Sequence, residues 1–263
     1  MAPAASAAER IAYQGEPGAY SHLACTQAYP DYEPVAHETF RDAFDAVADG
    51  AVALAMIPIE NSLGGRVADI HHLLPESSLF IIGEHFLPVQ HCLLGPRGST
   101  IETLERVESH PQALAQTREM LKELGLEGIQ VADTAGAARD IAERRDITTG
   151  AIASSLAAEV YDLEVLRTRI EDRLGNTTRF VVMSRQRVEP DLFEGPTITS
   201  LFFQVRSVPA ALYKALSGFA TTGVNITKLE SYIIDSSFTV AQFYAEIDGH
   251  PADKDVAQAL EEL

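Results

Sequence analysis

Apolar and polar positions follow two periodicities along residues 10–183. Short apolar runs are typical of strands, whereas apolar residues that recur every three or four positions are typical of amphipathic helices. The predicted strands are 10–15, 51–59, 78–95, 129–132, 149–153, 164–172 and 179–185, and the predicted helices are 18–29, 40–49, 111–124 and 135–145. Strands that alternate with helices favour an α/β fold with largely parallel strands, here in two sheets.

The long apolar run at 78–94 indicates that these elements form two lobes. A strand of this length can carry the chain from a first lobe into a second, and the segment 163–176 can carry it back. We therefore expect a second lobe at about 85–165, a hinge that the chain crosses twice, and a cleft between the lobes. Together they form a domain over residues 1–185.

A second unit follows a charged, proline-containing linker at 186–196. Its predicted strands are 199–206, 225–235 and 238–247, with one helix at 208–223 and a last helix that starts near Pro251. The order βαββα matches the α+β ferredoxin-like plan, which ends in a fourth strand. We expect residues 197–263 to form such a unit, either incomplete as given or lacking its tail.

Composition narrows the function. The net charge of −18 argues against nucleic acids and anionic membranes as partners, because both require clustered Lys and Arg. Two cysteines make no disulfide framework, the N-terminus lacks the features of a signal peptide, and no apolar run is long enough to span a bilayer, so we expect a cytoplasmic protein. The histidines lack metal-ligand spacing, and we expect neither a metal nor another cofactor.

Polar residues directly precede the last strand of the first domain, in the segment "GNTTRF". Because side chains alternate along a strand, Asn176 and Thr178 share one face, and Arg179 points to the other. Arg179 is therefore expected to brace the cleft by binding a carboxylate. The Asn–Thr pair either binds a ligand or only starts the strand.

Glu60, Asn61 and Ser62 follow an apolar strand, at the end where open α/β sheets bind ligands. The alternative is a turn that starts a helix at Gly64-Gly65, with Asn61 or Ser62 as its cap. In the segment 13–25 a Gly/Pro turn precedes a helix that carries Ser21. It has neither dinucleotide nor P-loop glycine spacing, which favours a tight turn lining the cleft over a nucleotide site.

The segment "SHPQALAQ" predicts the start of a helix. Pro111 suits the first helical position, and Ser109 or His110 is the expected cap. Gln112 and Gln116 lie one turn apart on a shared face. The free N–H groups of a helix start also bind carboxylates, so both capping and an anion site remain open here.

Taken in order, the segments "GEPGAYSHLA", "IPIENSLGG", "SHPQALAQ", "GNTTRF" and "GVNITKLES" resemble the prephenate dehydratase family with a C-terminal ACT regulatory domain. The resemblance covers nearly the whole chain. It implies a two-lobed catalytic domain like periplasmic binding proteins, with the active site in the cleft, and a homodimer or homotetramer. No helical chorismate-mutase segment precedes the first strand, so we expect a monofunctional member.

The resemblance also implies roles for the residues already singled out. The family's essential threonine falls on Thr178, and its other catalytic positions fall on Glu60, Asn61 and Gln116. The expected substrate-binding residues are Ser21, Ser109, His110, Asn176 and Arg179. The substrate is prephenate, which loses carbon dioxide and hydroxide to become phenylpyruvate. Hydroxide leaves poorly, so Thr178, or else a protonated Glu60, is expected to donate a proton to it.

L-Phenylalanine is the effector that the resemblance implies for the ACT domain. The matching positions are Ala211, Leu212, Gly223, Asn225, Glu230 and Ser231. Two departures weaken the match: Ala210 stands where glycine is usual, and Tyr232-Ile233 stands where Arg-Pro is common. The alternatives are an enzyme that uses arogenate, whose amine replaces the ketone, and a non-catalytic amino-acid sensor.

Overall fold

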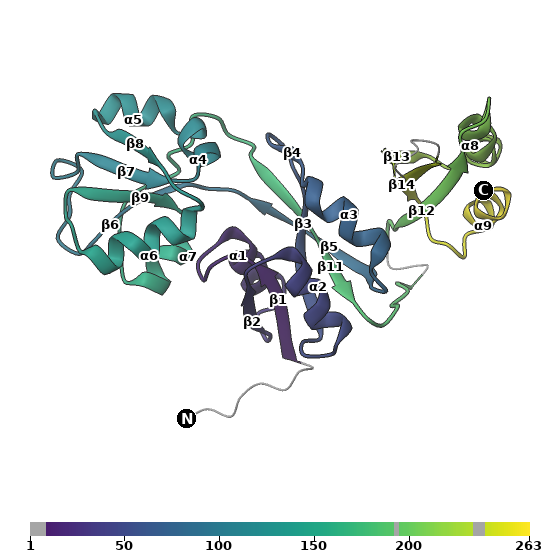
Figure 1. The fold of residues 1–263 in the computed structure, drawn as a ribbon, viewed down its shortest axis with the longest axis horizontal. Coiled ribbons are helices and arrows are strands. Elements are labelled where there is room, and N and C mark those ends of the chain that lie inside the picture. Colours follow the sequence, from purple (N-terminus) through teal and green to yellow (C-terminus); the bar gives the residue numbers. More distant parts are fainter. Residues whose placement is uncertain (1–8, 192–194, 234–239) are drawn as a thin grey trace. The chain divides into compact units, whose positions relative to one another are not determined.

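The computed structural model describes residues 9–191, 195–233 and 240–263. The chain forms two compact units, Met1–Arg187 and Val188–Leu263, whose elements are labelled in Figure 1. Three predicted features lie wholly or partly outside the described residues. They are the N-terminus up to residue 8, for which no signal peptide is expected, residues 192–194 of the linker, and the ends of two strands within 234–239.

The first lobe of unit 1 is a six-stranded sheet with the order β2-β1-β3-β11-β5, in which β4 pairs with β3. Its elements are β1 (Arg10–Gln14), α1 (Tyr20–Ala28), β2 (Glu33–His37), α2 (Phe40–Ala48), β3 (Leu54–Asn61), β4 (Gly65–Arg66), α3 (Ala68–Glu76), β5 (Phe80–Pro88) and β11 (Thr177–Ser184). Helix α1 buries Ala24 and Cys25 against Ile11, Met56 and Phe180 of the strands. This packing fixes which face of β11 turns toward α1.

The second lobe is a five-stranded sheet with the order β10-β6-β9-β7-β8 and helices on both faces. Its elements are β6 (Cys92–Gly95), β7 (Arg106–Ser109), α4 (Pro111–Gln116), α5 (Arg118–Leu124), β8 (Glu127–Gln130), α6 (Thr134–Arg144), β9 (Thr149–Ala153), α7 (Ser155–Tyr161) and β10 (Glu164–Thr168). Alanines of α6 and α7 pack against one face of the sheet, and α4 and α5 cover the other.

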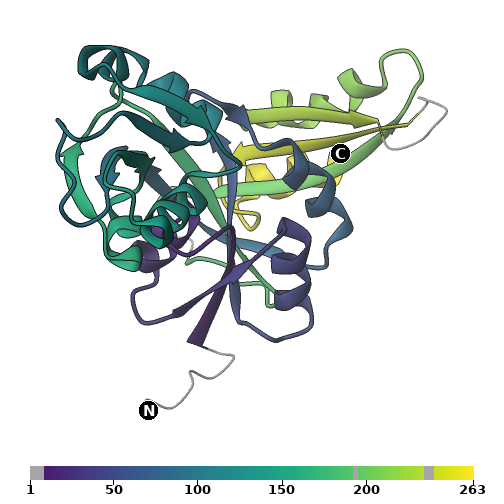
Figure 2. The same cartoon turned by 60° about the vertical axis from the view of Figure 1, so that its left-hand side comes forward.

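The predicted double crossing between the lobes is confirmed. The chain leaves the first lobe after β5, enters the second at β6, and returns between β10 and β11. In Figure 2 the return can be followed along the green β11. The expectation of largely parallel strands is wrong. Strands β1 and β7 have parallel neighbours. Strand β11, however, runs antiparallel to both β3 and β5, and β6 runs antiparallel to both β9 and β10. These two strands differ because the chain enters each sheet through them from the other lobe.

The helix predicted over 111–124 is broken at Thr117 into α4 and α5. Thr117 has φ −124° and ψ 18°, and its buried hydroxyl donates to the Ala113 carbonyl. Side-chain bonds of this kind compete with the backbone ladder. The Asp172 carboxylate, from the returning segment, then accepts the N–H groups of Glu119 and Met120, so a residue of the crossing caps α5.

Unit 2 is a three-stranded antiparallel sheet with the order β12-β14-β13. Its elements are β12 (Ile198–Arg206), α8 (Ala211–Thr222), β13 (Ile226–Ile233), β14 (Val240–Asp248) and α9 (Lys254–Glu262). The predicted order βαββα is confirmed, and Gly223 ends α8 in the left-handed conformation, at φ 76°. The last helix begins at Lys254 rather than near Pro251.

Candidate active site

Asn61, at the end of β3, lies opposite Thr178 at the start of β11. Paired residues of neighbouring strands point to the same face, which brings the two side chains together. Asn61 Nδ2 donates to Thr178 Oγ1 at 3.0 Å and to Asn176 Oδ1 at 2.7 Å. The predicted proximity of Asn176 and Thr178 is therefore confirmed, and Asn61 links them.

The turn after β3 holds Asn61 in place. The N–H groups of Leu63 and Gly64 donate to Asn61 Oδ1 at 3.0 and 2.7 Å. Ser62 Oγ donates to the Gly175 carbonyl and accepts the Thr177 N–H, both at 2.9 Å, so it ties this turn to the start of β11. The turn leads into β4 rather than directly into a helix, so the prediction of a helix starting at Gly64-Gly65 is wrong.

Gln116 reaches this group from the second lobe. Its Oε1 accepts Asn176 Nδ2 at 2.9 Å, and Asn176 is only 5% exposed. Asn61, Gln116, Asn176 and the Thr178 hydroxyl thus form one hydrogen-bonded set, called here the amide cluster. Its members come from both lobes and from the returning segment.

Sequence reasoning missed two residues that extend the amide cluster. His91, in the first crossing, lies with Nε2 at 2.8 Å from Gln116 Oε1, and its Nδ1 is 2.7 Å from the Tyr20 hydroxyl. His91 is 3% exposed, and burial lowers its pKa. Metal-ligand spacing was the wrong criterion for this histidine, because its partners are amide and hydroxyl groups.

Arg179 lies on the other face of β11, as predicted, and binds a carboxylate. Its Nε donates to Glu84 Oε2 at 2.7 Å, and its guanidinium lies 5.9 Å from the centre of the Phe86 ring. In the strand register Arg179 pairs with Glu60. Because side chains alternate along β3, this register places Glu60 with Arg179 and on the opposite face from Asn61.

Among the described residues, the remaining predicted site residues make no hydrogen bond to the amide cluster. Ser109 has no exposed surface, and its hydroxyl donates to the Ile152 carbonyl at 2.6 Å, so it belongs to the interior of the second lobe. His110 caps α4 by accepting the Gln112 N–H at 3.2 Å, as predicted. Ser21 lies half-buried in the first turn of α1.

The turn between β1 and α1 binds the second lobe. Ser154 Oγ donates to the Gly18 carbonyl at 2.6 Å, Tyr161 donates to the Pro17 carbonyl at 2.8 Å, and Arg139 forms an ion pair with Glu16 at 2.6 Å. We call these contacts the clasp. The Gly/Pro turn thus joins the two lobes.

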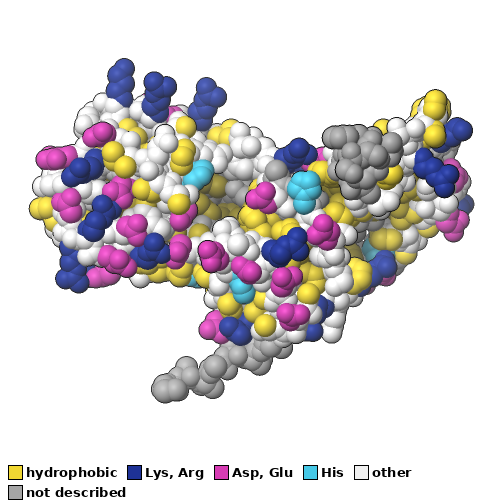
Figure 3. All heavy atoms as spheres, in the orientation of Figure 1, with side chains coloured by type: hydrophobic (Ala, Val, Ile, Leu, Met, Phe, Trp, Pro, Cys, Tyr) yellow, Lys and Arg dark blue, Asp and Glu magenta, His cyan; other side chains and the backbone are white. Residues whose placement is uncertain are grey.

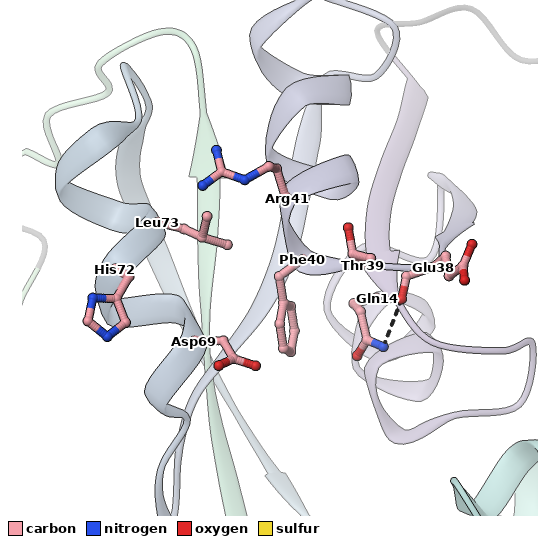
Figure 4. A pocket seen from close by; sticks show the side chains of 8 residues that line it. All are labelled: Gln14, Glu38, Thr39, Phe40, Arg41, Asp69, His72 and Leu73. Atoms are coloured by element: carbon pink, nitrogen blue, oxygen red, sulfur yellow. Dashed lines mark hydrogen bonds between the residues drawn. The ribbon is translucent and has the colours of Figure 1, made fainter.

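A separate hollow of about 410 Å³ lies in the first lobe (Figure 4). It is lined by Gln14, Glu38, Thr39, Phe40, Arg41, Asp69, His72 and Leu73. No member of the amide cluster lines it, and Gln14 Nε2 donates to the Glu38 carbonyl at its edge. Three of the four predicted catalytic residues, Asn61, Gln116 and Thr178, belong to the amide cluster, and none of the four lines this hollow.

The described residues also bear on two other types of site. They contain no group of three or more His, Cys, Asp or Glu side chains placed to hold a metal ion. None of the helices within the described ranges is both long and apolar enough to cross a bilayer. On the face drawn in Figure 3, described acidic and basic side chains are interspersed.

Comparison with known proteins identifies the family. Residues 11–188 match the family model of prephenate dehydratase. A bifunctional N-acyl-homoserine lactone acylase/prephenate dehydratase of Komagataeibacter europaeus is 50% identical over 256 residues, which cover 96% of this chain and 90% of that protein. Arogenate dehydratase 2 of Petunia hybrida is 42% identical over 268 residues, or 97% of this chain and 68% of that protein.

A solved structure supports the same family. The crystal structure of prephenate dehydratase in complex with L-Phe from Arthrobacter aurescens superposes with a TM-score of 0.86 at 28% identity, and the match covers 97% of this chain and 85% of that one. The similarity therefore includes both units of the chain. The chain belongs to the prephenate dehydratase family, whose members are lyases.

Proposed function

We propose that this chain converts prephenate to phenylpyruvate, water and carbon dioxide, with the amide cluster as its active site. One observation carries the proposal: Thr178 Oγ1 accepts a hydrogen bond from Asn61 Nδ2 at 3.0 Å. A hydroxyl that accepts from a fixed amide keeps its own proton for another partner. Thr178 can therefore donate toward a substrate oxygen.

The reaction needs such a donor. The bond between the ring and its carboxylate breaks, and its electron pair enters the ring. The ring C–O bond breaks in turn, and the departing hydroxide takes up one proton to become water. Donors aimed at a developing oxyanion typically contribute about 10²–10³ in rate. Thr178 supplies that hydrogen bond, and solvent ultimately supplies the proton consumed.

The neutrality of the amide cluster suits the loss of carbon dioxide. A cation that gripped the ring carboxylate would stabilise it and oppose its departure. Asn61, Gln116 and Asn176 are uncharged, and the nearby Arg179 is engaged by Glu84 on the other face of β11. Since the strand register places Glu60 on that face as well, the geometry favours Thr178 over Glu60 as the donor.

Two relatives define the alternative substrates. The Petunia relative is an arogenate dehydratase, and the Komagataeibacter relative is also named an acylase. An acylase needs an activated nucleophile. Ser109 is buried and bonded to a carbonyl, and burial raises the pKa of both Cys25 and Cys92, so these groups do not favour that chemistry. Arogenate differs from prephenate by an amine in place of the ketone and fits the same donors.

The test supplies prephenate, arogenate and an N-acyl-homoserine lactone separately and measures phenylpyruvate, phenylalanine and free homoserine lactone. We expect phenylpyruvate from prephenate, and a loss of about 10²–10³ in kcat in Thr178→Val, with a smaller change in KM. Thr178→Ser, which keeps the hydroxyl, should retain most of the rate. Normal turnover in Thr178→Val would eliminate Thr178 as the donor, and no product from prephenate would overturn the substrate assignment.

We further propose that unit 2 is an ACT domain that binds L-phenylalanine in a homodimer or homotetramer. The relative from Arthrobacter aurescens was solved in complex with L-Phe, which supports this ligand. The candidate residues are Ala211, Leu212, Gly223, Asn225, Glu230 and Ser231. Asn225 donates to Asp248, and Glu230 pairs with Lys228 and Tyr232, so both are held in place within the unit. Calorimetry with L-phenylalanine tests the binding of this ligand. Light scattering with and without L-phenylalanine tests the oligomeric state.

A further inference from the structure

The backbone fixes the orientation of each side-chain amide in the cluster. A backbone N–H can only donate, so the Asn61 atom that accepts from Leu63 and Gly64 is the amide oxygen. The other end of this amide is then the NH₂ group. Its two hydrogens go to Asn176 Oδ1 and Thr178 Oγ1, which orients Asn176 in turn.

The same direction continues into the second lobe. Asn176 Nδ2 donates to Gln116 Oε1 at 2.9 Å. That oxygen carries no hydrogen, so His91 Nε2, at 2.8 Å, must donate to it. Burial lowers the pKa of His91, and a neutral ring with its hydrogen on Nε2 has a bare Nδ1. The Tyr20 hydroxyl donates to this Nδ1 at 2.7 Å, a nearer acceptor than the Gln90 carbonyl at 3.1 Å.

We propose that His91 is a positioning residue that acts through Gln116. Its Nε2–H holds the Gln116 oxygen toward Asn176, so Gln116 can present only its NH₂ hydrogens to the substrate. Tyr20 keeps the ring in the tautomer that this requires. The inference rests on the proposed function, because the importance of donors at Gln116 comes from the oxygen-rich substrate. With the amide reversed, its oxygen would face substrate oxygens and repel them.

The tautomer can be measured without any activity. The chain has eight histidines, and ¹⁵N-histidine labelling with His91→Phe as the reference assigns the His91 signal. We expect a ring with hydrogen on Nε2, and in Tyr20→Phe a weaker preference for that tautomer. A His91 ring without the Nε2 hydrogen would overturn the proposal. If the chain fails to dehydrate prephenate, this measurement still decides the orientation of the cluster, so the two failures are distinguishable.

A double-mutant cycle tests whether His91 acts through Gln116. His91→Phe keeps a ring in the buried site and should lower kcat about tenfold, the effect of one lost hydrogen bond. In a Gln116→Leu background the same change should cost nothing further, because the amide it orients is gone. If the losses in kcat of His91→Phe and Gln116→Leu multiplied in the double variant, the proposal would be overturned. If His91→Phe does not fold, the same cycle is measured with Tyr20→Phe, a smaller change for which the same coupling to Gln116→Leu is expected.

His22 provides the matched control. It is half-buried, whereas His91 is buried. Its Nδ1 accepts the Gly18 N–H at 3.0 Å, and its ring stacks on Tyr13. None of these contacts involves Gln116. Whatever loss His22→Phe causes should therefore multiply with that of Gln116→Leu. If His22→Phe were as strongly coupled to Gln116→Leu as His91→Phe is, the coupling would not be specific to His91, and the proposed role would be overturned.

Discussion

Ser154 makes two hydrogen bonds that serve different purposes, and its removal measures the strength of the clasp. The side chain is 1% exposed. Its Oγ accepts the Ala157 N–H at 3.1 Å, as the N-cap of α7, and donates to the buried Gly18 carbonyl of the other lobe at 2.6 Å. Ser154→Ala removes both bonds and adds no bulk.

The expected magnitude follows from these two parts. Loss of a serine N-cap costs about 1 kcal/mol. A buried carbonyl that loses its partner costs about 1–3 kcal/mol more. The sum of about 2–4 kcal/mol corresponds to a fall in Tm of about 5–15 °C for a unit of this size. Because the chain has no tryptophan, calorimetry or circular dichroism is the suitable assay.

Asp133→Ala is the matched control. Asp133 caps α6 of the same lobe by accepting the Gly136 N–H at 2.6 Å, without a hydrogen bond to the first lobe among the described residues. Its loss should cost about 1 kcal/mol, or about 2–4 °C in Tm. Equal shifts for Ser154→Ala and Asp133→Ala would refute the idea that the Gly18 contact stabilises the arrangement of the lobes.

Three further predictions concern single residues. Arg179→Gln should lower the free energy of unfolding by about 1–2 kcal/mol in urea titrations, because it removes a charge-assisted bond to the partly exposed Glu84. Ala210 has φ 63°, a left-handed conformation in which a Cβ is strained, so Ala210→Gly should raise the free energy of unfolding by about 1 kcal/mol. Ala211→Gly is the control: this residue is the first of α8, so the change should lower the free energy of unfolding. Hydrogen bonds, first from the Thr148 N–H and then from threonine hydroxyls, lower the pKa of Asp146 from 3.8 to about 2. The free energy that these bonds contribute to folding is fully present above pH 3.8 and is lost as the pH falls through about 2. The difference in Tm between the wild type and Asp146→Asn should therefore be present at pH 5 and disappear as the pH falls below about 2.

Periodicity located several elements accurately but joined neighbouring ones: the predicted strand 78–95 is the two strands β5 and β6, and the predicted helix 111–124 is the two helices α4 and α5. Strands β1 and β9 and helices α1, α2 and α6 lie within two residues of the predicted ranges. Strand β2 was missed because its sequence, EPVAH, contains a proline and leaves two of its five residues exposed. Helix α7 has only seven residues and was missed for its shortness. Local pattern is weak wherever an element is short or lies at an edge.

The candidate site was predictable only in part. The strand ends located Asn61, Asn176 and Thr178, since side-chain alternation and the carboxyl ends of strands are properties of local sequence. The links between them are not local. Tyr20 and His91 are 71 residues apart, and His91 and Gln116 are 25 apart. Only the double crossing brings these groups together, and no spacing rule detects a histidine whose partners are an amide and a phenol.

The same crossing makes the amide cluster depend on how the lobes are held. The Asn176–Gln116 bond, at 2.9 Å, joins the returning segment to the second lobe. Hydrogen bonds of this kind have donor–acceptor distances of about 2.7–3.2 Å, so a small shift between the lobes would break it. The clasp residues touch no member of the cluster by any hydrogen bond described here, yet they join the same two lobes. A weakened clasp should therefore reduce kcat without altering any reacting group. If Ser154→Ala lowered Tm as predicted but left kcat unchanged, the cluster would be held by the crossings alone, and the clasp would serve stability only.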